Sequence, residues 1–162
     1  MTPAADIALL VLDVDGVLTD GRLWYGADGE SCKAFDVRDG HGIKQLLAAG
    51  VGVAVISGRR SPAVTARMRE LGVSDVAQGV GDKARALAEL LKRNAIEARR
   101  VACLVDDTPD LGLMAAVGLP AAVADAHPAV LAAARHVTRA PGGRGAVREF
   151  CDWLLESRGA SR

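Results

Sequence analysis

The sequence has few aromatic residues and no excess of either charge. Phe, Trp and Tyr make up 3% of its 162 residues, so Val, Leu and Ala must fill most of a folded interior. Lys and Arg number 20, Asp and Glu also number 20, and the formal net charge is zero. The overall charge therefore gives no reason to expect a nucleic acid or an anionic membrane surface as a partner.

Long apolar runs and paired cysteines are also missing. No stretch of about 18 apolar residues could cross a bilayer, and the first residues lack the basic start and apolar segment of a signal peptide. Cys32, Cys103 and Cys151 are far apart and form no C-x-x-C pair. Reduced thiols in a cytoplasmic protein are the simplest interpretation.

Short apolar runs alternate with helical patterns along the chain. Runs typical of strands buried on both faces of a parallel sheet occur at residues 7–12, 51–56, 101–105 and 119–123. Helical spacing occurs at residues 42–49, 62–71, 83–93 and 145–157, and a further helix opens at Thr108. We therefore predict an α/β fold, a Rossmann-like three-layer sandwich with a central parallel sheet. The length suits a single domain over residues 1–162, with a C-terminal tail from about residue 158.

The segment from about residue 21 to 36 breaks the alternation, because it is rich in glycine and aromatic residues. This composition predicts a β-hairpin that projects from the body of the protein. Trp24, Tyr25 and Phe35 are three of the five aromatic residues in the chain. An exposed cluster of them would favour association with another protein surface.

Oxygen-rich side chains follow three of the predicted strands. Asp13 and Asp15 come after the first, Ser57 after the second, and Asp106 and Asp107 after the run at 101–105. Because the carboxyl ends of parallel strands meet at one edge of a sheet, these side chains are expected to share a site. A cluster of carboxylates needs a cation, and oxygen ligands alone favour Mg²⁺.

A phosphate ester would fit such a site. Asp13 can act as a nucleophile on phosphorus, while Asp15 protonates the leaving alkoxide and later takes a proton from water. Ser57 can donate a hydrogen bond to the phosphoryl oxygens, and Lys83 can balance the developing charge. A single D-x-D or Ser-Gly is common in surface turns, so the prediction depends on all these residues occurring together.

Four segments resemble the motifs of the haloacid dehalogenase superfamily of phosphatases. They are residues 13–20 (DVDGVLTD), residues 57–59 (SGR), Lys83 and residues 106–111 (DDTPDL). The resemblance implies that Mg²⁺ is held by the side chains of Asp13 and Asp106 and by the main-chain carbonyl of Asp15. Asp107 and Asp110 would support the metal shell and the lysine.

The chain departs from the superfamily pattern at Val105, where members usually have glycine, so the backbone there is expected to differ slightly. Three further segments, 35–43, 123–128 and 142–149, are similar to 3-deoxy-D-manno-octulosonate 8-phosphate (KDO 8-phosphate) phosphatases. That resemblance spans about residues 7 to 155. It implies hydrolysis of KDO 8-phosphate to KDO and phosphate in the synthesis of lipopolysaccharide precursors.

Many members of the superfamily insert a cap domain between these motifs. Here about 35 residues separate Asp20 from Ser57, and the hairpin and one helix account for them. The interval from Ser57 to Lys83 holds only a helix and a short strand, so no cap domain is expected. The resemblance implies instead a homotetramer, in which hairpins associate and the segment 142–148 approaches a neighbouring active site.

Candidate contacts for an anionic sugar acid are Arg38, Gly58, Arg59 and Arg144. Three alternatives stay open at this point. The substrate could be a nine-carbon sugar acid 9-phosphate, of KDN or N-acetylneuraminate, or the chain could be a phosphatase-like subunit that serves in protein interactions. A non-enzymatic receiver module fits least, because its acidic pair and its phosphoacceptor follow a different order along the chain.

Overall fold

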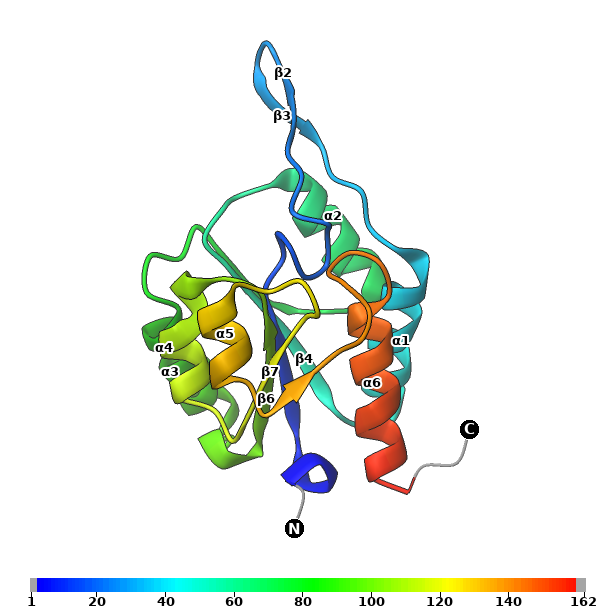
Figure 1. The fold of residues 1–162 in the computed structure, drawn as a ribbon, viewed down its shortest axis with the longest axis vertical. Helices are drawn as coiled ribbons and strands as arrows, with labels where there is room; N and C mark the ends of the chain where they lie inside the picture. Colours follow the sequence, from blue (N-terminus) through cyan, green and yellow to red (C-terminus); the bar gives the residue numbers. More distant parts are fainter. Residues whose placement is uncertain (1–2, 160–162) are drawn as a thin grey trace.

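The computed structural model describes residues 3–159, and its main sheet has six parallel strands in the order β5-β4-β1-β6-β7-β8 (Figure 1). The strands are β1 (Leu9–Leu12), β4 (Gly52–Ser57), β5 (Asp75–Gln78), β6 (Val101–Val105), β7 (Leu119–Ala122) and β8 (His136–Val137). The four apolar runs and the short strand after residue 71 are confirmed. The sequence did not reveal β8, because two residues form no recognisable pattern.

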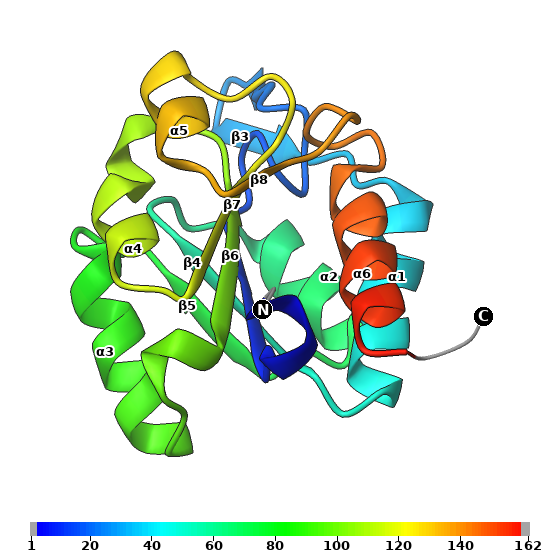
Figure 2. The same cartoon turned by 60° about the horizontal axis from the view of Figure 1, so that its bottom comes forward.

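Helices cover both faces of this sheet and confirm the three-layer sandwich (Figure 2). On one face lie α1 (Val37–Ala48), α2 (Pro62–Leu71) and α6 (Ala146–Ser157), and on the other α3 (Lys83–Asn94), α4 (Leu111–Ala115) and α5 (Pro128–Ala133). Short 3₁₀ turns occur at Pro3–Asp6 (η1), Ala98–Arg100 (η2) and Thr108–Asp110 (η3). Among the helices of residues 3–159, none is long and apolar enough to span a bilayer.

Two helix starts differ from the sequence prediction for local reasons. Helix α1 begins at Val37 rather than at residue 42, because the Asp36 side chain accepts a hydrogen bond from the Arg38 amide and caps the helix. The helix expected at Thr108 begins as η3 and becomes α-helical at Leu111. Helix α2 begins at Pro62 as predicted, although the Ser61 side chain makes no capping hydrogen bond.

Aliphatic side chains fill the core, as the shortage of aromatic residues requires. All four residues of β1 are buried, which is expected for a central strand covered by helices on both faces. Helix α6 buries an apolar face that includes Val147, Phe150 and Leu154, and the helix packs against α1. This contact fixes the C-terminal part of the chain on the helix that follows the hairpin.

The predicted hairpin is present, formed by β2 (Trp24–Gly26) and β3 (Gly29–Cys32), and it projects from the carboxyl edge of the main sheet (Figure 1). Trp24 and Tyr25 are 55% and 64% exposed. Only this hairpin and α1 lie between β1 and β4, which confirms that no cap domain is inserted there.

The glycine-rich segment 142–145 packs against the loop 16–20 of the same chain. The Gly143 amide donates a hydrogen bond to the Val17 carbonyl at 2.8 Å. A Cβ atom on Gly142 would overlap the Gly16 carbonyl oxygen, so only glycine allows this close approach. The C-terminal segment therefore supports the loop that directly follows Asp15.

A buried carboxylate ties the same segment to α1. Asp39 accepts hydrogen bonds from the amides of Arg148 (2.8 Å) and Gly145 (3.4 Å), at the start of α6. Burial, more than the nearby Asp36, raises the pKa of Asp39 to about 6. Asp39 thus holds the N-terminal end of α6 beside the loop 16–20.

We expect Gly142→Ala to lower the free energy of unfolding by about 1–3 kcal/mol, the usual cost of forcing an extra methyl group into a packed site. Urea denaturation would measure this change. Gly112→Ala in α4 is the matched control, since its Cβ would lie 3.7 Å from the Ala84 Cβ, an ordinary contact. The control should be unchanged or gain up to about 1 kcal/mol. Equal stability of Gly142→Ala and the wild type would contradict the close approach.

Candidate active site

The carboxyl ends of β1, β4 and β6 meet at one edge of the sheet, because β1 lies between the other two strands. Asp13 follows β1, Ser57 ends β4, and Asp106 follows β6. A cavity of about 340 Å³ opens there. It is lined by Asp13, Asp15, Gly21, Ser57, Gly58, Arg59, Lys83, Asp106, Asp107, Pro109 and Asp110.

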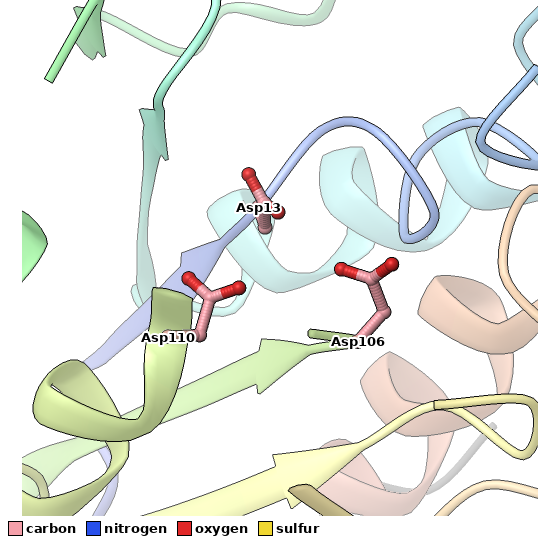
Figure 3. A group of neighbouring side chains, drawn as sticks. All are labelled: Asp13, Asp106 and Asp110. Carbon is pink, nitrogen blue, oxygen red and sulfur yellow. The ribbon is translucent and has the colours of Figure 1, made fainter. Parts of the chain in front are cut away.

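Three carboxylates gather at this edge, those of Asp13, Asp106 and Asp110 (Figure 3). One oxygen from each lies within 4.8 Å of the others. The Asp106 Oδ1 atom is buried and has no hydrogen-bond partner among residues 3–159. Gly16 makes room for this side chain, since a Cβ there would overlap the Asp106 Oδ2 atom, and the glycine adopts a φ of +85°.

Lys83 is the cation that faces this group. It is the first residue of α3, and its Nζ atom lies 2.6 Å from Asp110 Oδ1 and 3.0 Å from Asp13 Oδ1. Burial alone would lower the pKa of Lys83, but the two carboxylates together raise it above its usual value. The lysine therefore stays protonated between the two aspartates.

One lysine does not balance two buried carboxylates and the half-buried one of Asp106. Burial, with the charges of Asp13, Asp110 and Asp107, raises the pKa of Asp106 to about 7. Burial and the charge of Asp13 likewise raise the pKa of Asp110 to about 6, against the opposing effect of Lys83. A divalent cation would relieve this repulsion and would give Asp106 Oδ1 the partner it lacks. Because every candidate ligand is an oxygen, the site fits Mg²⁺.

The Asp15 carboxylate is not part of that group. Its Oδ1 atom lies 2.5 Å from Lys33 Nζ, and its Oδ2 atom lies 3.9 Å from Arg59 Nε. The contribution to a metal that the resemblance implies for Asp15 is its main-chain carbonyl, which stays a prediction. Sequence reasoning missed Lys33 and its second partner Glu30, because only the return of the hairpin brings them to the strand edge.

The other predicted site residues divide into those that line the cavity and those that lie outside it. Gly58 and Arg59 line the cavity beside Ser57, and Arg59 Nη2 donates hydrogen bonds to Glu30 (3.1 Å) and to the Tyr25 hydroxyl (3.2 Å). Asp107 also lines the cavity, and its side chain accepts a hydrogen bond from the Thr108 amide.

Arg38 and Arg144 lie outside the residues that line the cavity. Arg38 pairs with Asp36 at 2.7 Å and donates a hydrogen bond to the Arg144 carbonyl at 3.2 Å. The Arg144 side chain is 62% exposed and lies 3.9 Å from Asp20. Both guanidinium groups are therefore at the surface rather than in the cavity, and that of Arg144 lies beside Asp20 of the loop 16–20.

Val105 does not disturb the strand on which Asp106 depends. It is fully buried, pairs with Ala122 in the sheet, and its carbonyl accepts a hydrogen bond from the Val123 amide at 3.1 Å. The ladder between β6 and β7 therefore continues to the last residue before Asp106, and valine is accommodated where glycine was expected.

A larger hollow, of about 730 Å³, lies beside α2 and β5. Its lining includes Arg60 and Arg69 but no aspartate or glutamate. It therefore lacks the carboxylates that line the smaller cavity at the sheet edge.

Comparison with known proteins places this arrangement in a family. A 3-deoxy-D-manno-octulosonate 8-phosphate phosphatase of Escherichia coli is 48% identical over 98% of this chain and 85% of its own length. This chain belongs to that phosphatase family. A family model described as haloacid dehalogenase-like hydrolase matches residues 70–148, which include Lys83 and the segment 106–111.

Solved structures of the family have the same fold. A cobalt-bound phosphatase from Haemophilus influenzae has a TM-score of 0.96 at 44% identity and covers 98% of this chain and 92% of its own. A phosphatase from Moraxella catarrhalis, solved with a magnesium ion, a phosphate ion and KDO, has a TM-score of 0.94 at 39% identity. That match covers 97% of this chain and 90% of the relative.

The raised pKa of Asp106 leads to a prediction about stability. An aspartate has an ordinary pKa of about 3.9, so the folded metal-free protein binds more protons than the unfolded chain and loses stability as pH rises toward 7. In EDTA at pH 8, the Asp106→Asn protein is expected to have a larger free energy of unfolding than the wild type, by about 1 kcal/mol or more after solvent screening.

Denaturant unfolding at pH 5 and pH 8, with EDTA or with Mg²⁺, would measure this difference in the free energy of unfolding between Asp106→Asn and the wild type. The difference should shrink at pH 5, and Mg²⁺ should stabilise the wild type more than the variant. Asp28→Asn removes the same charge from an exposed position in the hairpin and serves as the control. A less stable Asp106→Asn protein in EDTA at pH 8 would show that the three carboxylates do not repel one another.

Proposed function

We propose that this protein is a Mg²⁺-dependent phosphatase that hydrolyses KDO 8-phosphate to KDO and inorganic phosphate. The observation that carries the proposal is 48% identity to an enzyme of this activity over 98% of the chain. The cavity that Asp13, Lys83 and Asp106 line supplies the chemistry, since it joins a nucleophile, a cation and a carboxylate cluster suited to a metal.

In the first step, a carboxylate oxygen of Asp13 attacks phosphorus and the bond from phosphorus to the sugar oxygen breaks. Asp15 gives its proton to that oxygen, so the sugar leaves as an alcohol and Asp13 carries the phosphoryl group. Lys83 contacts Asp13 and can stabilise charge on the phosphoryl oxygens. Ser57, buried at the end of β4, supplies a hydrogen-bond donor to the same oxygens.

In the second step, Asp15 is a carboxylate and takes a proton from water. The water oxygen attacks phosphorus, the bond to Asp13 breaks, and inorganic phosphate leaves, which restores Asp13 as a carboxylate and Asp15 as an acid. Mg²⁺, held by the side chains of Asp13 and Asp106 and the main-chain carbonyl of Asp15, would neutralise charge on the phosphate oxygens.

The remaining site residues support these steps. Asp110 holds Lys83 toward Asp13, and Asp107 adds negative charge beside Asp106. Gly58 and Arg59 line the cavity where the substrate would enter. Arg38 and Arg144 are exposed guanidinium groups, and we assign them to the sugar-acid carboxylate at the outer side of the loop 16–20.

The other functions considered fit less well. A nine-carbon sugar acid 9-phosphate would use the same chemistry, but the relatives reported above act on, or hold, the eight-carbon sugar acid. A purely structural subunit would have no need for a buried Lys83 between two carboxylates or for an unpartnered Asp106 oxygen.

We expect the purified wild type with Mg²⁺ to hydrolyse KDO 8-phosphate and to lose activity in EDTA. Asp13→Asn should lower kcat by about a thousandfold or more, because the covalent nucleophile is removed. Phosphate release measures both effects. Turnover of a nine-carbon sugar acid 9-phosphate should have a lower kcat/KM, and an equal or reversed preference would contradict the substrate proposed here. Full activity of Asp13→Asn would contradict the mechanism.

Self-association through the hairpin is part of the same proposal. Leu23, Trp24 and Tyr25 are large, apolar and exposed, which is unusual for neighbouring residues on a surface that stays in water. A homotetramer would bury them and bring a second chain near the open cavity. We also assign a cytoplasmic location, because Cys32, Cys103 and Cys151 are all free thiols.

Sedimentation velocity tests the association. The wild type is expected to sediment as a tetramer, and Trp24→Glu should raise the dissociation constant about tenfold or more, because a buried aromatic contributes more than about 1.4 kcal/mol. Val137→Glu makes the same change at an exposed apolar residue of β8, away from the hairpin, and should leave the tetramer intact. A Trp24→Glu protein that remains fully tetrameric would exclude the hairpin as the contact.

A further inference from the structure

The hairpin delivers one buried cation to the active site. Lys33 follows β3 directly, and its side chain is 1% exposed. Its Nζ atom lies 2.5 Å from Asp15 Oδ1 and 3.2 Å from Glu30 Oε2. A lysine ammonium is buried only when it is paired, so this position is maintained by the two carboxylates.

Arg59 completes a group of four charges around Asp15. Its Nη2 atom lies 3.1 Å from Glu30 Oε2, and its Nε atom lies 3.9 Å from Asp15 Oδ2. Glu30 thus bridges the two cations, and the cations face opposite oxygens of Asp15. When Asp15 is ionised, as it is at the start of the second step, the two carboxylates and the two cations balance, which distinguishes this group from the acidic cluster around Asp106.

The site therefore has one lysine for each carboxylate of the Asp13-Val14-Asp15 segment. Lys83 enters from α3 and contacts Asp13, whereas Lys33 enters from the hairpin and contacts Asp15. Lys33 is absent from the cavity lining, while Asp15 is part of it. Lys33 is thus placed to act on a bound substrate through Asp15 rather than by touching it.

We propose that Lys33 is a positioning residue for Asp15: its hydrogen bond to Oδ1 fixes the carboxyl group in the orientation needed for proton transfer. The inference rests on the proposed phosphatase function. In the first step the proton passes from Asp15 to the sugar oxygen as the bond from phosphorus to that oxygen breaks. In the second, a proton passes from water to Asp15. Both transfers depend on where the carboxyl group points, and a displacement of about 1 Å can cost about a hundredfold in rate.

Two substrates separate this role from a general structural one. The alkoxide of a sugar leaves poorly without a proton, whereas p-nitrophenolate leaves readily without one. With KDO 8-phosphate, Lys33→Met is expected to lower kcat about a hundredfold with less than a threefold change in KM. With p-nitrophenyl phosphate, the Lys33→Met protein should release one p-nitrophenolate per active site in an initial burst. The rate of this burst should be within about tenfold of the wild-type rate, and slow turnover should follow.

The slow phase is expected because the second step needs Asp15 as a base for either substrate. A double-mutant comparison checks that the effect passes through Asp15. When Asp15→Asn is already present, adding Lys33→Met should change the rates less than about twofold. A further loss of a hundredfold in that background would overturn the inference, as would equal losses in the first step with both substrates.

Two further variants test whether the kinetic loss of Lys33→Met arises from misfolding or from the unbalanced charge of Glu30. Lys33→Met combined with Glu30→Gln removes one cation and one carboxylate together, and it should show the same kinetic loss as Lys33→Met alone. Lys44→Met makes the same substitution at an exposed position of α1 and should behave as the wild type. Circular dichroism and thermal melts identify any variant that is unfolded.

The outcomes also distinguish this inference from the function on which it rests. Wild-type protein that hydrolyses neither substrate with Mg²⁺ would refute the phosphatase function itself. An active wild type with an equally active, folded Lys33→Met protein would refute only the role of Lys33. A large increase in KM at unchanged kcat would instead make Lys33 a substrate contact and would overturn its action through Asp15.

Discussion

The repulsion among the carboxylates of Asp13, Asp106 and Asp110 is the constraint on which the rest of the active site depends. One oxygen from each lies within 4.8 Å of the others in a partly buried position, where like charges interact more strongly than in water. Lys83 relieves part of this repulsion by contacting Asp13 and Asp110, but Asp106 keeps a raised pKa and an unpartnered oxygen. A fold that holds these groups together at such a cost is suited to a cation and to the phosphate that the cation attracts.

The hairpin has both an exposed apolar surface and charged residues that reach the active site. Its first strand exposes Trp24 and Tyr25. Lys33, just after its second strand, contacts Asp15 and is paired with Glu30 of that strand. Because Arg59 contacts both Tyr25 and Glu30, the strand end at β4 is linked to the hairpin by side chains. Any contact that holds the hairpin in place would therefore also hold the carboxyl group of Asp15, in a fold without a cap domain over the cavity.

The C-terminal segment stabilises the other side of the same loop. Gly142 and Gly143 pack directly on the backbone of residues 16–20, and Asp39 holds the start of α6 beside them. The glycine-rich segment was expected to approach a neighbouring active site, and within one chain its backbone supports the loop after Asp15. The exposed side chain of Arg144 is the part of this segment that remains available to a substrate or to another chain.

Most of the fold could be predicted from the sequence, because buried strands and capped helices leave local patterns of apolar residues. The same holds for Asp13, Ser57, Lys83 and Asp106, since each lies at a strand end or a helix start, and the edge of a parallel sheet brings such positions together. The strand β8 was not predictable, because two residues carry no periodicity. Nor was the separation of Arg38 and Arg144 from the cavity predictable, since a sequence gives no sign of where a long, flexible arginine side chain points.

The pairing of Asp15 with Lys33 depended wholly on tertiary structure. The two residues are 18 positions apart, and between them the chain leaves the sheet, turns at the hairpin and returns. No periodic pattern crosses such an excursion, so no spacing along the chain relates the lysine to the carboxylate. The residues themselves determined that Asp13, Lys83 and the carboxylates of Asp106 and Asp110 would share one sheet edge. The folded hairpin decided which charges surround the second carboxylate, because long-range electrostatic contacts depend on distance in space rather than on separation in sequence.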